Sequence, residues 1–284
     1  MGVLKDLYRL LSPKFQNFFL DYKLDANPRY GPGAKMPAIE SLEAIISANS
    51  NSYSTLIKEI LSRCANITSL EANTTKRGLD FKWDNGYFPG LDVAVLYILI
   101  ATKKPQRIIE IGSGTSTMII SQAIHDYNLN AKITSIDPQP RAFIDQLADQ
   151  VYRQPLHKCD IDIAEQLSCG DILFLDGSHR LLPNSDVMVF FLEILPKLKS
   201  GVIVQIHDIY LPYDYPGFMC QRMYSEQYAL AIAMLNNPSR YKVLAPNYYI
   251  SEQPIFIKQL LPLWGASSLK NVEKHGGSFW FEVV

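Results

Sequence analysis

Two apolar runs in the sequence each end in a small group of acids and imidazoles. Residues 171–176 are followed by Gly-Ser-His179, and residues 201–206 are followed by His207-Asp208. An imidazole with an unperturbed pKa of about 6.5 can take a proton near neutral pH, as deprotonation of a hydroxyl requires. Packing does not readily explain four polar groups after two apolar runs. We therefore expect a site for proton transfer, with Asp176, His179 and His207 as its catalytic residues.

A second stretch, residues 106–117, has the pattern of a nucleotide-type site. A β-branched apolar run leads into Gly112-Ser-Gly114, and an apolar pattern at helical spacing follows. The glycines permit a tight turn, and the free N–H groups of the new helix face a ligand. Thr117 stands where a dinucleotide fingerprint has its third glycine, and no phosphate-loop lysine follows. The stretch resembles the first motif of class I S-adenosylmethionine-dependent methyltransferases, Glu-x-Gly-x-Gly, which implies a cofactor contact at Glu110, Gly112, Ser113, Gly114 and Thr115.

Two further carboxylates are expected at this cofactor. Asp137 ends the run of residues 133–136 and lies 25 residues after Gly112, close to the separation of about 20 expected for a carboxylate that binds ribose hydroxyls. Asp160 follows a short strand predicted near residues 157–159, where it can accept a hydrogen bond from the adenine amino group.

The elements that must position these residues alternate between strand and helix. Strands are predicted near residues 107–112, 132–137, 171–176 and 201–207, with helices near 116–127, 140–150 and 185–195. Such alternation favours a parallel sheet, whose strands share one carboxyl edge where ligands bind. A helix near 225–236, a strand near 241–245 and a terminal strand after residue 278 follow. By resemblance to class I methyltransferases, we expect an α/β, Rossmann-like, doubly wound, mostly parallel seven-stranded sheet with an antiparallel last strand.

Residues 1–80 are expected to form an N-terminal helical cap, and residues 81–284 the S-adenosylmethionine-binding domain. An amphipathic helix is predicted over residues 3–19, with further helices near 38–49 and 52–66. The apolar face of the first helix packs on its own domain or on a second copy, and a homodimer is plausible. The aromatic, turn-rich residues 81–90 are expected near the methionine end of the cofactor.

Composition bounds the partners and the compartment. The formal charge of −1 gives no field that favours nucleic acid. The four cysteines include no C-x-x-C pair, as expected for reduced thiols in a cytoplasmic protein. No run of about 18 apolar residues predicts a membrane span.

The motif D-G-x-H from Asp176, the following His207-Asp208-Ile, and the Tyr- and Pro-rich residues 210–216 together resemble bacterial small-molecule methyltransferases related to sugar and macrolide O-methyltransferases. The resemblance covers about residues 81–284. It implies O-methylation of a small-molecule acceptor, with Tyr210, Tyr213 and Tyr215 as an aromatic wall for it.

Metal-dependent relatives in this group hold a divalent cation, usually magnesium. The resemblance places such an ion on Asp176, His207 and Asp208. His207 stands in place of a carboxylate, which weakens the case for magnesium and leaves manganese, zinc and no metal open.

Two other functions share parts of this pattern. An NAD-dependent oxidoreductase has the same strand, turn, helix and ribose carboxylate, although Thr117 and the terminal antiparallel strand argue against it. A methyltransferase-like protein that binds a ligand without catalysis is the third interpretation.

Overall fold

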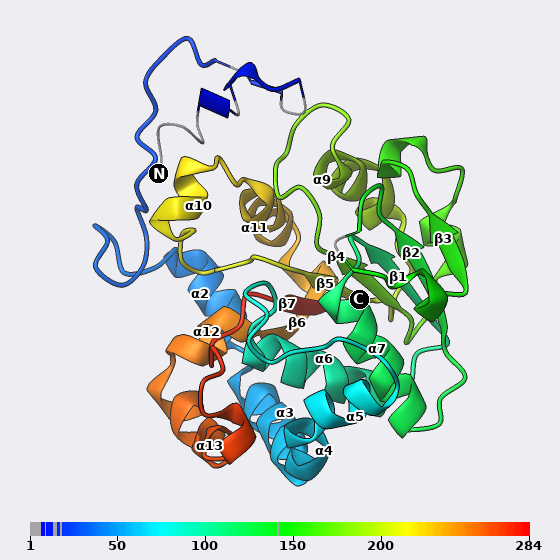
Figure 1. The fold of residues 1–284 in the computed structure, drawn as a ribbon. Coiled ribbons are helices and arrows are strands. Elements are labelled where there is room, and N and C mark those ends of the chain that lie inside the picture. Colours follow the sequence, from blue (N-terminus) through cyan, green and yellow to red (C-terminus); the bar gives the residue numbers. More distant parts are fainter. Residues whose placement is uncertain (1–6, 9, 14–15, 18, 141) are drawn as a thin grey trace.

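A seven-stranded sheet forms the centre of the molecule in a computed structural model, which describes residues 7–8, 10–13, 16–17, 19–140 and 142–284 (Figure 1). The strand order is β3-β2-β1-β4-β5-β7-β6. The first five strands pair in parallel, whereas β7 is antiparallel to both β5 and β6. This confirms the predicted sheet. Its strands are β1 (Arg107–Ile111), β2 (Lys132–Ile136), β3 (Gln150–Tyr152), β4 (Ile172–Leu175), β5 (Ile203–Ile206), β6 (Tyr241–Pro246) and β7 (Phe279–Val283).

The central strands are buried on both faces, as their apolar composition requires. Every residue of β4 and β5 is buried, and β1 and β2 each expose only their first residue. Such strands are stable only when helices cover both sides of the sheet. In Figure 1, α6 (Gly90–Lys103) and α7 (Thr115–Asp126) lie on one side, and α9 (Asp186–Val189) and α11 (Glu226–Asn236) lie on the other.

The helices before residue 80 pack directly on this core. α3 packs against α6 and α13, and α5 packs against α7. The structure does not test a domain boundary at residue 80. Of the helix predicted over residues 3–19, residues 7–8 and 10–11 are helical, whereas residues 12–13, 16–17 and 19 are not, and the rest of that span lies outside the described residues. The elements concerned are α2 (Glu40–Ser47), α3 (Ser50–Ser62), α4 (Cys64–Thr68), α5 (Leu70–Lys76) and α13 (Pro254–Trp264).

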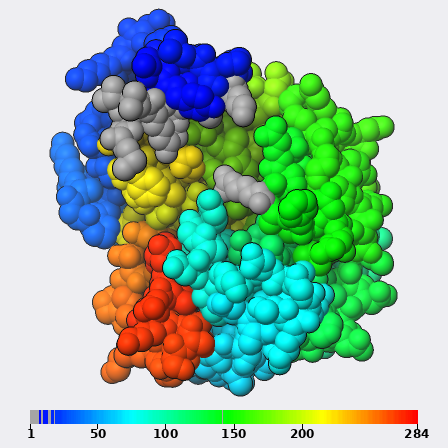
Figure 2. Space-filling model, in the orientation of Figure 1, coloured from blue at the N-terminus to red at the C-terminus, as the bar shows by residue number. Residues whose placement is uncertain are grey.

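The segment before α2 folds back onto a distant loop. The backbone N–H groups of Arg29 and Tyr30 donate to the carboxylate of Asp214, and Ile39 N–H donates to the carbonyl of Pro212. Figure 2 shows blue atoms from the early part of the chain near yellow atoms from its last third on this face of the molecule. The remaining helices are α8 (Ile163–Gln166), α10 (Gly217–Gln221) and α12 (Asn247–Glu252). None of the helices within the described ranges combines the length and apolar character needed to cross a bilayer.

Two predicted elements between β2 and β4 are wrong. In place of a helix near 140–150, the chain makes a single 3₁₀ turn at Asp145–Leu147 and then β3. In place of a strand near 157–159, it makes the 3₁₀ helix Leu156–Lys158. β3 is an edge strand whose first two residues are exposed, so it lacks the apolar run by which the inner strands are recognised.

Candidate active site

A cavity of about 1060 Å³ opens at the carboxyl ends of the parallel strands. Its wall comes from the turn after β1, the segment after β2, residues 176–186 and residues 78–88. Ligand sites of small molecules commonly occupy about 300–1,000 Å³, so a nucleoside-sized cofactor and an acceptor fit together. The predicted site residues that line it are Gly112, Ser113, Gly114, Thr115, Asp137, Asp176 and His179.

The turn after β1 requires glycine at position 112. Gly112 has a φ of +84°, and a Cβ there would lie 1.8 Å from the carbonyl oxygen of Asp176. The backbone N–H of Gly114 donates to Oγ1 of Thr117 at 3.1 Å. The first residues of α7 line the cavity, so the N–H groups at this helix start are available to a ligand there. That they bind one stays a prediction.

Asp137 braces the turn from the end of β2. Its Oδ2 accepts a hydrogen bond from the N–H of Ser113 at 3.0 Å, and its Oδ1 accepts from the N–H of Gln139 at 2.7 Å. A carboxylate has about four acceptor positions, so two remain for ribose hydroxyls. Its half-buried place on the cavity wall supports that prediction.

Glu110 and Asp160 take other places than expected. Glu110 is fully buried on β1 and does not line the cavity, so it supports the turn from behind, and a direct contact with the cofactor stays a prediction. Burial raises the pKa of Glu110 to about 7, against the opposing effect of the Thr117 and Ser116 hydroxyls. Asp160 is exposed, follows a 3₁₀ helix and lies outside the cavity wall, so its predicted adenine contact loses its basis.

The ends of β4 and β5 bring Asp176, His179, His207 and Asp208 together, as predicted. We call these four residues the rim cluster. Nε2 of His179 lies 3.5 Å from Oδ1 of Asp176 and 3.5 Å from Oδ2 of Asp208. Nδ1 of His207 lies 3.4 Å from Oδ1 of Asp176 and 3.6 Å from Oδ1 of Asp208. Asp176 and His179 line the cavity, and His207 and Asp208 lie behind them.

The backbone is strained where it delivers the rim cluster. His179 and Asp208 have φ values of +59° and +54°, a left-handed conformation that non-glycine residues rarely adopt except where the surroundings impose it. Asp186 at the start of α9 accepts hydrogen bonds from the N–H and the hydroxyl of Ser178. A Cβ on Gly177 would lie 1.6 Å from Oδ2 of Asp186, which explains the glycine of the D-G-x-H motif.

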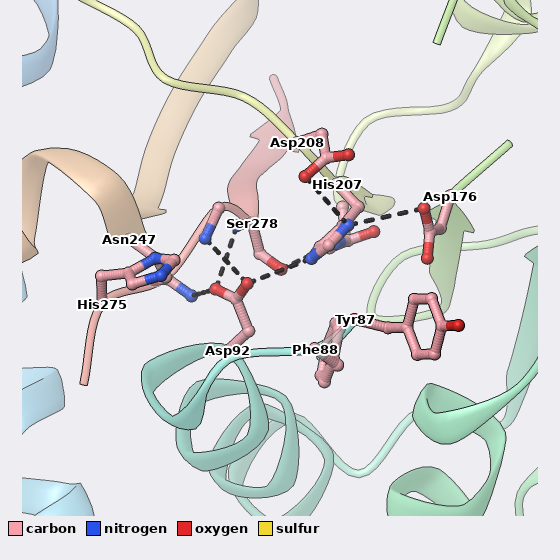
Figure 3. Close-up of polar contacts among 12 residues, drawn as sticks. Tyr87, Phe88, Asp92, Asp176, His207, Asp208, Asn247, His275 and Ser278 are labelled. Atoms are coloured by element: carbon pink, nitrogen blue, oxygen red, sulfur yellow. Dashed lines mark hydrogen bonds and ion pairs between the residues drawn. The ribbon is translucent and has the colours of Figure 1, made fainter. Parts of the chain in front are cut away.

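Two buried carboxylates behind the histidines escaped the sequence analysis. Nε2 of His207 lies 3.2 Å from Oδ2 of Asp92, and Nδ1 of His179 lies 3.1 Å from Oε2 of Glu226 (Figure 3 shows the first pair). Both carboxylates have no exposed surface. The sequence signal for Asp92 is a charged residue inside the otherwise apolar helix α6, because such residues are rarely buried without a partner.

The carboxylates around the histidines set their charge. Burial alone lowers the pKa of His207, but Asp176 and Asp208 raise it well above the ordinary value. Burial likewise lowers the pKa of His179, but the hydrogen bond to Glu226 and its charge outweigh burial and raise this pKa above the ordinary value. The surroundings of both imidazoles therefore stabilise the protonated form.

The donor atoms of the rim cluster suit a divalent cation in kind. Two imidazole nitrogens beside carboxylate oxygens favour manganese or zinc over magnesium, and Nδ1 of His207 is buried without a hydrogen-bond partner among the described residues. Within those residues, however, no group of three or more His, Cys, Asp or Glu side chains is arranged to hold an ion. A metal on Asp176, His207 and Asp208 stays a prediction.

The aromatic surface of the cavity differs from the predicted one. Tyr210, Tyr213 and Tyr215 do not line it. Tyr215 is fully buried, edge-on to Tyr210 at 6.0 Å between ring centroids. The residues 81–90 do reach the cavity, through Asn85, Tyr87 and Phe88, and the sequence analysis missed Phe143 and His157, which also line it.

Comparison with known proteins agrees with this geometry. Residues 109–209 match a family model described as a methyltransferase domain. This span contains the glycine turn, Asp137 and the whole rim cluster. With the sheet order and its antiparallel β7, the match defines the class of the protein: it is a class I S-adenosylmethionine-dependent methyltransferase, and S-adenosylmethionine is its cofactor. The alternative of an NAD-dependent oxidoreductase is thereby set aside.

Several solved methyltransferase structures are similar in chain path. A Podospora anserina methyltransferase bound to S-adenosylhomocysteine is 16% identical, with 76% of this chain and 88% of that chain covered and a TM-score of 0.45. An O-methyltransferase from Bacillus cereus, with the same ligand, is 15% identical over 87% of this chain and 100% of that chain, with a TM-score of 0.41. The plantazolicin methyltransferase BpumL is 15% identical over 80% and 98%, with a TM-score of 0.44. Curated protein sequences gave no significant match.

Proposed function

We propose that this methyltransferase transfers the methyl group of S-adenosylmethionine to a hydroxyl oxygen of a small molecule. One observation carries the proposal: two imidazoles and two carboxylates meet within 3.4–3.6 Å at the cavity edge. A neutral amine needs no such group to attack a methyl donor. A hydroxyl must lose its proton around the transition state, so a base beside the acceptor is useful.

The reaction forms one bond and breaks one. The acceptor oxygen bonds to the methyl carbon, the carbon–sulfur bond breaks, and its electron pair stays on sulfur, so that S-adenosylhomocysteine and a methyl ether result. The hydroxyl proton goes to Nε2 of His179 in its neutral form, the rim-cluster imidazole that lines the cavity. Asp176 and Asp208, each 3.5 Å from this nitrogen, stabilise the imidazolium.

Two effects supply the rate. Holding the acceptor in line with the methyl donor can contribute roughly 7–11 kcal/mol. A positioned general base adds about 10²–10⁴-fold. The cavity wall supplies the first, and the rim cluster supplies the second.

Calorimetric titration and a labelled-methyl assay test the proposal in sequence. S-adenosylmethionine and S-adenosylhomocysteine are expected to bind, and NAD is not. Matched hydroxyl and amine compounds, with the same carbon skeletons, are then offered with methyl-labelled donor. Label is expected in hydroxyl products, and His179→Gln is expected to lose about 10²–10⁴-fold in turnover while its donor affinity is retained.

The matched control is His125→Gln, an imidazole with 62% of its side chain exposed and outside the cavity wall. It is expected to keep wild-type turnover. Label in amines alone, or full activity in His179→Gln, would refute the proposal.

A further inference from the structure

The two histidines of the rim cluster share one arrangement. Each presents one ring nitrogen to Asp176 and Asp208 and directs the other to a fully buried carboxylate, Asp92 for His207 and Glu226 for His179. The two rings use different nitrogens for this: Nδ1 of His207 faces Asp176 and Asp208, whereas in His179 Nε2 faces them. A chance ion pair would not be expected twice at one site with the outer carboxylate unexposed in both cases.

The partners of Asp92 fix the proton on His207. Oδ1 of Asp92 accepts hydrogen bonds from Nδ2 of Asn247 at 2.7 Å and from the N–H of Ser278 at 3.0 Å. Oδ2 accepts from the N–H of Gly277 at 2.8 Å and lies 3.2 Å from Nε2 of His207. The first three neighbours can only donate, and an ionised carboxylate can only accept. Nε2 of His207 is therefore the donor in the fourth contact.

The surroundings leave the ring of His207 no other position. The Phe88 ring lies 5.1 Å away between centroids, and the His207 side chain is only 4% exposed. Asp92 is confined as well, because a Cβ on Gly276 would lie 2.4 Å from its Oδ1. Figure 3 shows Asp92 pointing from α6 to His207, with Asp176 and Asp208 beyond the ring.

Glu226 holds His179 in the same way. It is the first residue of α11, fully buried, with Oε2 3.1 Å from Nδ1 of His179. The ring of Tyr224 stacks on the imidazole with 4.7 Å between centroids and an interplanar angle of 20°. The N–H of Ser225 donates to the carbonyl of His179 at 2.9 Å. The start of α11 thus fixes both the backbone and the ring of this histidine.

We propose that Asp92 and Glu226 are positioning residues for the methyl-transfer reaction. Each accepts the proton of the outer nitrogen of its histidine, so the tautomer and the ring orientation are set and the other nitrogen faces Asp176 and Asp208. Partners of this kind, one step behind the reacting groups, typically change activity by about 10–100-fold when removed. The catalytic consequence rests on the proposed function, whereas the tautomers do not.

Nitrogen-15 NMR of the histidines tests the tautomers in the wild-type protein. The chain has five histidines, so single His→Gln substitutions assign every ring. Spectra are recorded at a pH high enough for each ring to hold one proton. The remaining proton is expected on Nε2 in His207 and on Nδ1 in His179. A proton on the opposite nitrogen of either ring would overturn the proposal, and this measurement needs no variant of Asp92 to fold.

The variant Asp92→Asn tests the consequence. The amide nitrogen of the variant is a donor at a position where two of the four contacts need an acceptor. The proton of His207 is therefore no longer expected to stay on Nε2. Turnover is expected to fall by about 10–100-fold with unchanged affinity for S-adenosylmethionine, since Asp92 does not line the cavity. The matched control, Asn247→Ala, alters the same network at Oδ1 without contacting His207 and is expected to keep the tautomer.

The outcomes separate the two proposals. Asp92→Asn with wild-type turnover, or an equal loss of the tautomer in Asn247→Ala, would refute a positioning role. If the tautomers are as stated but no hydroxyl compound is methylated, the proposed function fails and the assignment of the buried carboxylates stands.

Discussion

Glu110→Gln is expected to remove a pH-dependent loss of stability. Glu110 has a pKa raised by burial from 4.5 to about 7 in the folded protein. Below pH 4.5 the group is protonated in both states and adds no pH dependence. As the pH rises from 4.5 through 7, the unfolded chain ionises while the folded chain does not, so the free energy of unfolding decreases. Above pH 7 both states ionise and the loss reaches a plateau.

The size of the loss follows from the two pKa values. The difference between 7 and 4.5, at about 1.4 kcal/mol for each pH unit, gives about 3 kcal/mol at the plateau. Most of it accumulates between about pH 5 and pH 8. A change of that size is a large part of the 5–15 kcal/mol that typically stabilises a domain of this kind, taken as a rough range.

Urea denaturation of wild type and Glu110→Gln at several pH values measures the loss directly. Taking the difference between the two proteins at each pH cancels the titrating groups that do not interact with Glu110, which are all but nearby carboxylates such as Asp137 and Asp176. Glu193→Gln makes the same chemical change at an exposed position and should give a flat difference. If the difference for Glu110→Gln is flat as well, or if the variant weakens above pH 7, Glu110 is ionised when folded and the reasoning about its burial is wrong.

Three further predictions concern the cavity wall and the rim cluster. Gly112→Ala should abolish S-adenosylmethionine binding, because its Cβ would meet the carbonyl of Asp176 at 1.8 Å. Gly170→Ala is the matched control, because Gly170 has a similar φ of +88° but a Cβ there would meet nothing within 4 Å. It should lose only about 1–2 kcal/mol of stability to left-handed strain. Equal losses of stability in the two variants in thermal denaturation would contradict this. Asp137→Ala should weaken donor binding roughly tenfold, as loss of about 1.4 kcal/mol implies, and unchanged calorimetric affinity would exclude the ribose contact. Manganese added after chelation should raise the Tm of wild type but not of Asp208→Asn, and a Tm that is unchanged in both would argue against the metal site.

The sequence was sufficient for the elements whose signal is local. The strands β1, β2, β4 and β5 are short apolar runs, and the polar residue that ends each one lies at the shared carboxyl edge. The positions of Asp137, Asp176 and His207 follow from that rule alone. The terminal strand was likewise recognisable from its own residues, and its antiparallel pairing is confirmed.

What the sequence did not predict depends on contacts between distant segments. Asp160 was misplaced because β3 is an exposed edge strand without an apolar run. Tyr215 was expected on the cavity wall, but the loop that carries it folds onto its own aromatic residues. Asp92 lies within α6 and Glu226 begins α11. The apolar periodicity of a helix gives no information about a histidine partner more than 40 residues away in sequence.

The buried network at Asp92 has a consequence for folding. The turn after β1, where the methyl donor is expected to bind, is built from segments close in sequence, residues 110–139, and can form early. Asp92 instead joins His207, 115 residues later, to Asn247 and Gly277, which are 155 and 185 residues later. Contacts of such sequence separation form slowly, and these require β7 to insert between β5 and β6. During synthesis, the chain should therefore acquire a place for the methyl donor well before it acquires an oriented base.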